Sequence, residues 1–151
     1  RDQGSPIHDV SFLFADIDNF GQLNKEYGHD VGDKVLQTVA NALDDSLILG
    51  HPGRTEDLVA RVGGEEFVVI FPGSARYTIR DQITDPATGE FRKLEVCYVD
   101  NEKGIDLRIT MSAGLAGYRN GEKFEDTIRR ADAAMRTAKS TGRNRVFVEK
   151  D

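Results

Sequence analysis

Apolar residues along the chain form blocks whose spacing separates strands from helices. Residues 10–17, VSFLFADI, are almost continuously apolar, which predicts a central strand buried on both faces. The next segment, NFGQLNKEYG, predicts a short helix. In residues 29–49 apolar side chains recur every four positions, which predicts an amphipathic helix with its N-cap at or beside Asp30.

Two short apolar runs, 58–62 and 67–71, flank GGEE and predict a β-hairpin. The rest of the chain predicts, in order, a short helix at 74–83, strands at 92–99 and 105–118, a helix from 124 that ends at Gly142, and a strand at 145–148. This order predicts an α+β fold with a single mixed or antiparallel central sheet flanked by helices. No repeat or linker interrupts it, so we expect one domain over residues 1–151.

Composition and charge narrow the function. A net charge of −6 argues against a broad nucleic-acid surface, but it allows a small phosphate site. The one cysteine, Cys97, excludes a disulfide framework. No apolar run approaches the roughly 20 residues of a membrane span. Because the chain begins at Arg1, we expect a cytoplasmic piece of a longer protein, without membrane contact of its own, whose upstream regulatory domain can be a sensor or a membrane tether.

The tip of the predicted hairpin places Glu65 and Glu66 side by side, although like charges repel. Asp16 ends the first strand, and it converges with Glu65 if the hairpin pairs beside that strand. Carboxylates are hard oxygen ligands that suit Mg²⁺ or Mn²⁺. Gly63 and Gly64 would let the backbone approach a substrate closely. The alternative is a solvated polar turn with unrelated acids.

Three segments in order, ADIDNFGQLNKEYGHDVGDKVL, RVGGEEF and RRADAAMRTAKSTGRNRV, resemble the GGDEF family of diguanylate cyclases. The resemblance runs from about residue 10 to residue 148, nearly the whole chain. It implies a fold related to polymerase palms and class III nucleotide cyclases. It also implies a reaction in which two GTP give cyclic di-GMP and two pyrophosphates, with two Mg²⁺ or Mn²⁺ ions at each site.

The resemblance assigns roles to the acids. It implies that Asp16, the carbonyl of Ile17 and Glu65 are the metal ligands. Glu65 also matches the proposed acid/base position, and Glu66 is the second acid of the motif and assists it. Asp16, Glu65 and Glu66 are therefore the expected catalytic residues.

Further positions match substrate contacts of the family. Asn24 and Asp33 match guanine-reading positions, and His29 matches a substrate contact or is simply a helix-cap or loop histidine. Lys139 and Arg143, four residues apart at a helix end, match phosphate-binding positions. Their alternative is a solvated helix C-terminus, where cations are favourable.

The segment RTED carries Arg54 and Asp57, five residues before the glycine pair. It matches the family's inhibitory RxxD motif, which implies feedback inhibition by bound cyclic di-GMP. The alternative is a surface ion pair of little energetic value. Because the product is two-fold symmetric and each domain carries one GTP, catalysis implies a homodimer.

The chain departs from the family pattern in three places. Gly21 stands where the family commonly has a phosphate-stabilising lysine, which Lys25 could replace. The helix after the hairpin looks shortened, and the usual lead-in is absent upstream of residue 10. Three functions therefore stay open: an active diguanylate cyclase, which we favour, a weakened domain that senses GTP or cyclic di-GMP, and a cyclase with relaxed base choice, against which Asp33 argues.

Overall fold

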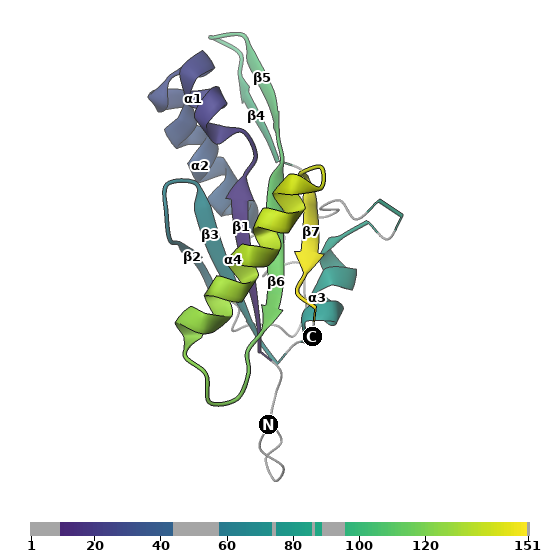
Figure 1. Ribbon diagram of the computed structural model, residues 1–151. Helices are drawn as coiled ribbons and strands as arrows, with labels where there is room; N and C mark the ends of the chain where they lie inside the picture. The colour runs from purple at the N-terminus through teal and green to yellow at the C-terminus, as the bar shows by residue number, and fades with distance from the viewer. Residues whose placement is uncertain (1–9, 44–57, 74, 86, 89–95, 151) are drawn as a thin grey trace.

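Figure 1 shows the computed structural model, which describes residues 10–43, 58–73, 75–85, 87–88 and 96–150. The helices of this part are α1 (Phe20–Tyr27), α2 (His29–Leu43), α3 (Arg76–Ile83) and α4 (Phe124–Ser140). Its strands are β1 (Val10–Ile17), β2 (Leu58–Arg61), β3 (Glu66–Pro72), β4 (Val96–Asp100), β5 (Ile105–Ile109), β6 (Met111–Gly117) and β7 (Arg145–Val148).

The central sheet has five strands in the order β2-β3-β1-β6-β7. All neighbours are antiparallel except β6 and β7, which are parallel. The most apolar strand, β1, lies in the middle, as its continuous run of buried side chains predicts. The predicted α+β fold with a mixed central sheet is confirmed.

Alternate side chains of β1 face two different layers. Leu13 and Ala15 pack into the core that α1, α2 and α3 cover, whereas Phe12 and Phe14 pack against α4. Figure 1 shows α4 crossing the sheet on one face, with α2 behind the other. A Cβ on Gly114 of β6 would lie 2.1 Å from a main-chain oxygen of α4, so this glycine lets the helix lie directly on the sheet.

Two expectations about the strands and helices are wrong. The predicted strand at 105–118 is two strands that lie in different sheets, because β5 pairs with β4 in a separate two-stranded sheet. The break falls at Thr110, whose carbonyl accepts a hydrogen bond from the Asp18 N–H at 2.9 Å instead of continuing a ladder. Helix α2 begins at His29, directly after Gly28, the C-cap of α1, so Asp30 lies in the first turn and not at the N-cap.

The other predicted elements in the described part are confirmed, including the short helix at α3 and the end of α4 before Gly142. Residues 44–49 and 92–95 of the predicted elements lie outside the described residues. Among the helices that the structure describes, none has both the length and the apolar character needed to cross a membrane.

Candidate active site

The C-terminal end of β1 lies beside the tip of the β2–β3 hairpin. Asp16 is opposite Glu66 in the antiparallel ladder. The Ile17 N–H donates a hydrogen bond to the Glu65 carbonyl at 3.2 Å. Across the turn, the Val62 N–H donates a hydrogen bond to the Glu66 carbonyl at 2.9 Å. This pairing brings the predicted metal ligands together at one end of the central sheet.

The hairpin tip carries excess negative charge. Partial burial raises the pKa of the Glu66 carboxyl above its ordinary value of 4.5. Three neighbouring carboxylates raise it further, those of Asp16, Asp132 and Glu65, while the Arg136 guanidinium lowers it. A positive charge placed among these groups would therefore be stabilised.

The two glycines of the hairpin differ in their surroundings. A Cβ on Gly63 would lie 2.3 Å from Glu66 Oε1, so the glycine leaves room for this carboxylate to lie over the turn. Gly64 is exposed and has nothing within 4 Å of the corresponding position. Of the two glycines, only Gly64 leaves open space for an approaching molecule.

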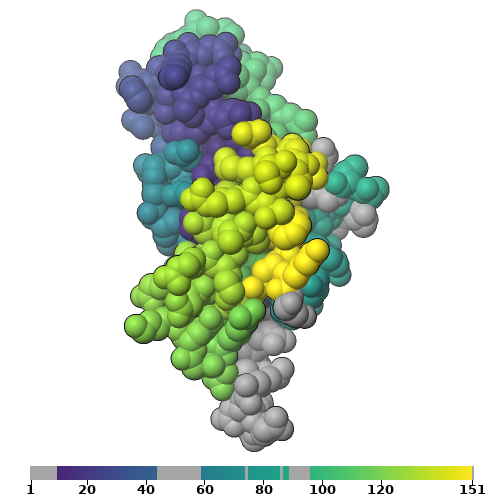
Figure 2. Space-filling model, viewed as in Figure 1, coloured from purple at the N-terminus to yellow at the C-terminus, as the bar shows by residue number. Residues whose placement is uncertain are grey.

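Lys139, in the last turn of α4, reaches the end of β1. Its Nζ lies 2.9 Å from Asp16 Oδ1 and 3.8 Å from Asp18 Oδ1. The first contact is ionic but lacks the alignment of a hydrogen bond, which leaves the buried Asp16 Oδ1 without a hydrogen-bond donor. Figure 2 shows the C-terminal end of α4 just below the region of α1, on one face of the molecule.

Asp18 is a residue of this site that the sequence reasoning missed. Its side chain is 1% exposed. Its Oδ1 accepts a hydrogen bond from the Ser112 hydroxyl at 2.6 Å, and its Oδ2 accepts from the Thr110 hydroxyl at 2.7 Å and from the Asn144 N–H at 3.0 Å. The available signal was the spacing of two acids in ADID, since residues two apart in an extended chain point the same way.

The corner between α4 and β7 has an unusual backbone. Arg143 and Asn144 have positive φ angles of 61° and 47°. Such conformations cost residues other than glycine about 1 kcal/mol or more each, although asparagine tolerates them better than most. The bond from the Asn144 N–H to Asp18 helps to hold this corner, and with it the exposed Arg143, near the end of β1.

The predicted base-reading residues lie on the helix pair α1–α2. Asn24 Oδ1 is buried and has no hydrogen-bond partner. A Cβ on Gly32 of α2 would lie 1.9 Å from this oxygen, so glycine at that position lets the Asn24 side chain lie where it does. Asp33 follows it in the chain and is exposed, as is His29 in the first turn. The structure thus places a buried amide oxygen without a hydrogen-bond partner against Gly32, the residue before the exposed Asp33.

The remaining predicted positions are less informative. Gly21 and Lys25 are both exposed on α1, and nothing lies within 4 Å of where a Cβ on Gly21 would be. Arg54 and Asp57, the predicted inhibitory pair, lie outside the described residues.

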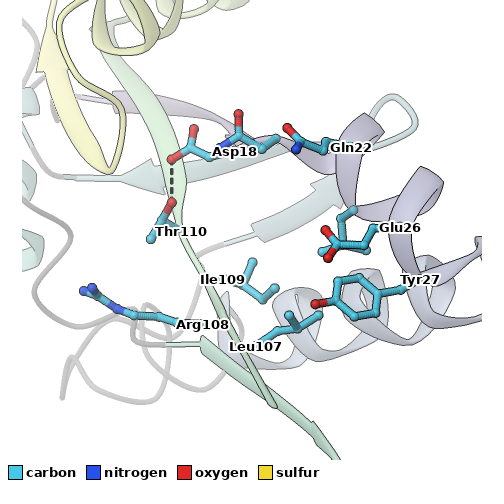
Figure 3. A pocket seen from close by; sticks show the side chains of 10 residues that line it. Asp18, Gln22, Glu26, Tyr27, Leu107, Arg108, Ile109 and Thr110 are labelled. Atoms are coloured by element: carbon cyan, nitrogen blue, oxygen red, sulfur yellow. Dashed lines mark hydrogen bonds between the residues drawn. The ribbon is translucent and has the colours of Figure 1, made fainter. Parts of the chain in front are cut away.

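A separate cavity of about 300 Å³ lies between α1 and β5 (Figure 3). Asp18 and Thr110 form part of its wall, joined by their hydrogen bond, and Glu26, Tyr27 and Arg108 are among the other residues that line it. None of the predicted site residues lines this cavity. The cavity is therefore distinct from the hairpin site. Asp18 connects the two, because it lines the cavity and also lies 3.8 Å from Lys139 Nζ.

The donor set at the hairpin fits a hard divalent cation. In the described part of the chain, no three His, Cys, Asp or Glu side chains lie close enough to hold a metal by themselves. The predicted set does not need them, because it combines Asp16 and Glu65 with the main-chain carbonyl of Ile17. A buried carboxylate oxygen without a hydrogen-bond donor, in excess negative charge, is what such a cation requires.

Comparison with known proteins identifies the family. The chain matches the family described as "Diguanylate cyclase, GGDEF domain" over residues 2–145. It is 36% identical over 140 residues to the diguanylate cyclase DgcP of Pseudomonas aeruginosa, covering 93% of this chain and 19% of that protein. It is 33% identical over 144 residues to the diguanylate cyclase DosC of Escherichia coli, covering 95% of this chain and 28% of that protein.

Solved structures agree with the sequence relatives. The crystal structure of the GGDEF domain of DgcB from Caulobacter crescentus, in complex with c-di-GMP, superposes with a TM-score of 0.70 at 30% identity. The match covers 93% of this chain and 78% of that one. The chain spans less than a third of the length of the two sequence relatives above. It belongs to the GGDEF domain family of diguanylate cyclases.

Proposed function

We propose that this domain condenses two molecules of GTP into cyclic di-GMP and two pyrophosphates. The observation that carries the proposal is the meeting of Asp16, the Glu65 hairpin and Lys139 at one end of the central sheet. Carboxylates for a cation and an ammonium for a phosphate then stand within one site. The complex of a similar GGDEF domain with c-di-GMP supports the class of product.

In each half-reaction the 3′-hydroxyl oxygen of one nucleotide bonds to the α-phosphorus of the other. The bond from that phosphorus to the bridging oxygen breaks, and pyrophosphate leaves. Such a step depends mainly on positioning and on neutralising charge. Glu65 accepts the proton of the attacking hydroxyl, and Glu66 assists from its place over the turn.

Asp16, Glu65 and the Ile17 carbonyl would hold Mg²⁺ or Mn²⁺, and we expect two ions per site. When bound, these ions lower the pKa of the attacking hydroxyl and neutralise charge on the phosphates. Lys139 and Arg143 bind the phosphates from the end of α4. Asp18 accepts a hydrogen bond from the Asn144 N–H and so fixes the backbone between α4 and β7.

The helix pair α1–α2 selects the base. Guanine presents N–H donors at N1 and N2, whereas adenine has no donor at either position. The unused Asn24 acceptor and the exposed Asp33 carboxylate suit those donors. We expect His29, in the first turn of α2, to contact the same nucleotide.

The product needs two domains, since each supplies one nucleotide to a two-fold symmetric ring. We therefore propose that the active form is a homodimer.

We also propose that Arg54 and Asp57 bind the product and inhibit the enzyme, through an arginine fork suited to phosphate or guanine. Arg54→Ala should then relieve product inhibition, and unchanged affinity for cyclic di-GMP in that variant would contradict the site.

A second function is favoured by one observation. Gly21 supplies no cation on the exposed face of α1, where the family pattern commonly has lysine. A domain that lacks this charge could bind GTP or cyclic di-GMP without appreciable turnover. It would then act as a sensor of the nucleotide.

Turnover at several protein concentrations separates the two functions. The purified domain is incubated with GTP and Mg²⁺, and the products are separated by chromatography, with Glu65→Ala as the control. Cyclic di-GMP that rises faster than linearly with protein, and is absent from the control, supports a dimeric cyclase. Nucleotide binding without product at any concentration would favour the sensor.

A further inference from the structure

We propose that Asp18 is a positioning residue that receives the Lys139 ammonium when a divalent cation binds Asp16. The proposal rests on the proposed function, because it gives Asp16 to a cation and Lys139 to a phosphate. Asp18 itself touches neither the cation nor the substrate. It acts by keeping Lys139 in the site after the ammonium has left Asp16.

Lys139 stands between two carboxylates at the end of β1. Its Nζ is 2.9 Å from Asp16 Oδ1 and 3.8 Å from Asp18 Oδ1. An ammonium and a divalent cation repel each other, so both cannot contact the same carboxylate oxygen. A cation that binds Asp16 Oδ1 therefore displaces Lys139, and in the described part of the chain Asp18 is the other carboxylate within 4 Å of its Nζ.

Asp18 holds its charge in a fixed place. Its side chain is 1% exposed, and its oxygens accept hydrogen bonds from Thr110, Ser112 and Asn144. Charge-assisted hydrogen bonds of this kind offset the cost of burying a carboxylate. Figure 3 shows the bond to Thr110. Among the residues that the structure describes, Lys139 is the only cation within 4 Å of it.

The same carboxylate also fixes the second predicted phosphate ligand. The Asn144 N–H donates to Asp18 Oδ2 at 3.0 Å, and Arg143 is the preceding residue of that left-handed corner. Asp18 thus attracts the Lys139 ammonium by its charge, and it fixes the backbone next to Arg143 by the hydrogen bond from the Asn144 N–H. One buried side chain then positions both cations relative to the metal ligands.

The test measures Mn²⁺ binding to the nucleotide-free domain by electron paramagnetic resonance, so it needs no turnover. Asp18→Asn keeps the size of the side chain and removes its charge. Lys139 then has Asp16 as its one anionic partner, and we expect the Mn²⁺ dissociation constant to rise about tenfold, within the range of coupling between contacting residues. Lys139→Met should lower the dissociation constant, because nothing then competes for Asp16.

The double variant decides the mechanism. If Asp18 acts through Lys139, Asp18→Asn should change the Mn²⁺ dissociation constant by less than about twofold in the Lys139→Met background. An effect as large as in the wild type would mean that Asp18 attracts the cation directly, and the proposal would be wrong. It would also be wrong if the wild type binds no Mn²⁺, if Asp18→Asn alone has no effect, or if Lys139→Met does not tighten binding.

Thr110→Val is the matched control for structure. It removes one hydrogen bond to Asp18 and leaves the charge. We expect a lower melting temperature with an unchanged Mn²⁺ dissociation constant. If Asp18→Asn does not fold, a crystal structure of the wild type with Mn²⁺ gives the answer. Lys139 Nζ should then lie within about 3.2 Å of Asp18 Oδ1, and an ammonium that remains on Asp16 or turns to solvent would overturn the proposal.

Discussion

The two ends of the central sheet both hold charged side chains shielded from solvent, but their charges are arranged differently. At the end where β6 finishes, Arg130 donates hydrogen bonds to both Glu149 oxygens, at 2.7 and 2.6 Å, to Glu122 and to the Gly117 carbonyl. Glu122 also accepts from the Thr127 hydroxyl at 2.7 Å. Arg130, Glu122 and Glu149 therefore each have a partner of opposite charge.

At the other end, carboxylates outnumber the cations that contact them. Lys139 is shared between Asp16 and Asp18, and Asp16 Oδ1 has no hydrogen-bond donor. The glutamate pKa values follow this difference. Partial burial and nearby carboxylates raise the pKa of Glu66, whereas hydrogen bonds and arginine charges outweigh burial and lower the pKa of Glu122.

Paired charges stabilise a fold, and an excess of charges of one sign indicates a place where an ion of the opposite sign can bind. On this comparison the Arg130 end ties α4 and the residues after β7 to the sheet. At the hairpin end we propose that like charges are kept close together, at a cost in stability, because a cation binds there. Substitutions at the two ends should therefore separate activity from stability.

The largest effect is expected from Glu65→Gln. It removes the proposed proton acceptor and metal ligand, so the rate of cyclic di-GMP formation should fall by about a thousandfold or more. The melting temperature should stay the same or rise, because one of several like charges is gone. Glu125→Gln, an exposed change in the first turn of α4, is the control. More than a tenth of the wild-type rate would contradict the role of Glu65.

Arg130→Met should produce the opposite pattern. It leaves Glu122 and Glu149 shielded without their main cation, which should cost about 3 kcal/mol of unfolding free energy. Turnover per folded molecule should not change. Denaturant unfolding measures the loss. Arg129→Met is the matched control, because among the described residues the ion pair of that exposed arginine is with Asp126, across one helical turn. An equal loss in both variants would show that the buried network is not what stabilises this end.

Much of the fold could be predicted from the sequence, because it depends on local periodicity. The apolar run of β1 and the repeating apolar positions of α2 and α4 are enough to assign those elements. The break at Thr110 could not be predicted. Its strand pattern is continuous, and the interruption comes from hydrogen bonds with Asp18, 92 positions away in the chain.

The site divides in the same way. That the end of β1 lies beside the Glu65 hairpin could be predicted from the sequence motif, and the structure shows this pairing in the Asp16–Glu66 register and in the bond from the Ile17 N–H to the Glu65 carbonyl. Asp18 could not, because its contacts come from residues 94 and 126 positions further along the chain. The local spacing of the two acids in ADID places Asp18 on the same side as Asp16, but it does not show these distant hydrogen bonds.

A smaller effect is expected from Gly21→Lys, which adds a cation to the unbalanced end. Nothing lies within 4 Å of the new Cβ, so the change fits without strain. If the missing charge limits phosphate stabilisation, turnover should rise about tenfold. Replacing glycine within α1 should also stabilise the helix by less than about 1 kcal/mol. Gly21→Ala is the control, since it shares the helix effect but not the charge, and equal rates in the two variants would remove Gly21 as a cause of slow turnover.

The smallest effects, and the most direct test of the comparison, are in the pH dependence of stability. The pKa of Glu122 is lowered in the folded state, so its ionised form stabilises the fold above its ordinary value of 4.5, and this contribution is lost as the pH falls through the lowered value. Glu122→Gln should therefore have a lower melting temperature than the wild type at neutral pH. This difference in melting temperature should disappear only when the pH falls below 4.5.

Glu66→Gln should show the reverse sign. Because the folded-state pKa of Glu66 is raised, its ionised form destabilises the fold, and the variant should melt above the wild type at neutral pH. This difference in melting temperature should disappear as the pH falls through the raised pKa of Glu66 towards 4.5. It should do so before the difference for Glu122→Gln begins to shrink. Melting curves in a chelating buffer from neutral to acid pH measure both. Differences of the same sign would mean that the two ends of the sheet do not differ in charge balance, and the contrast drawn from their contacts would be wrong.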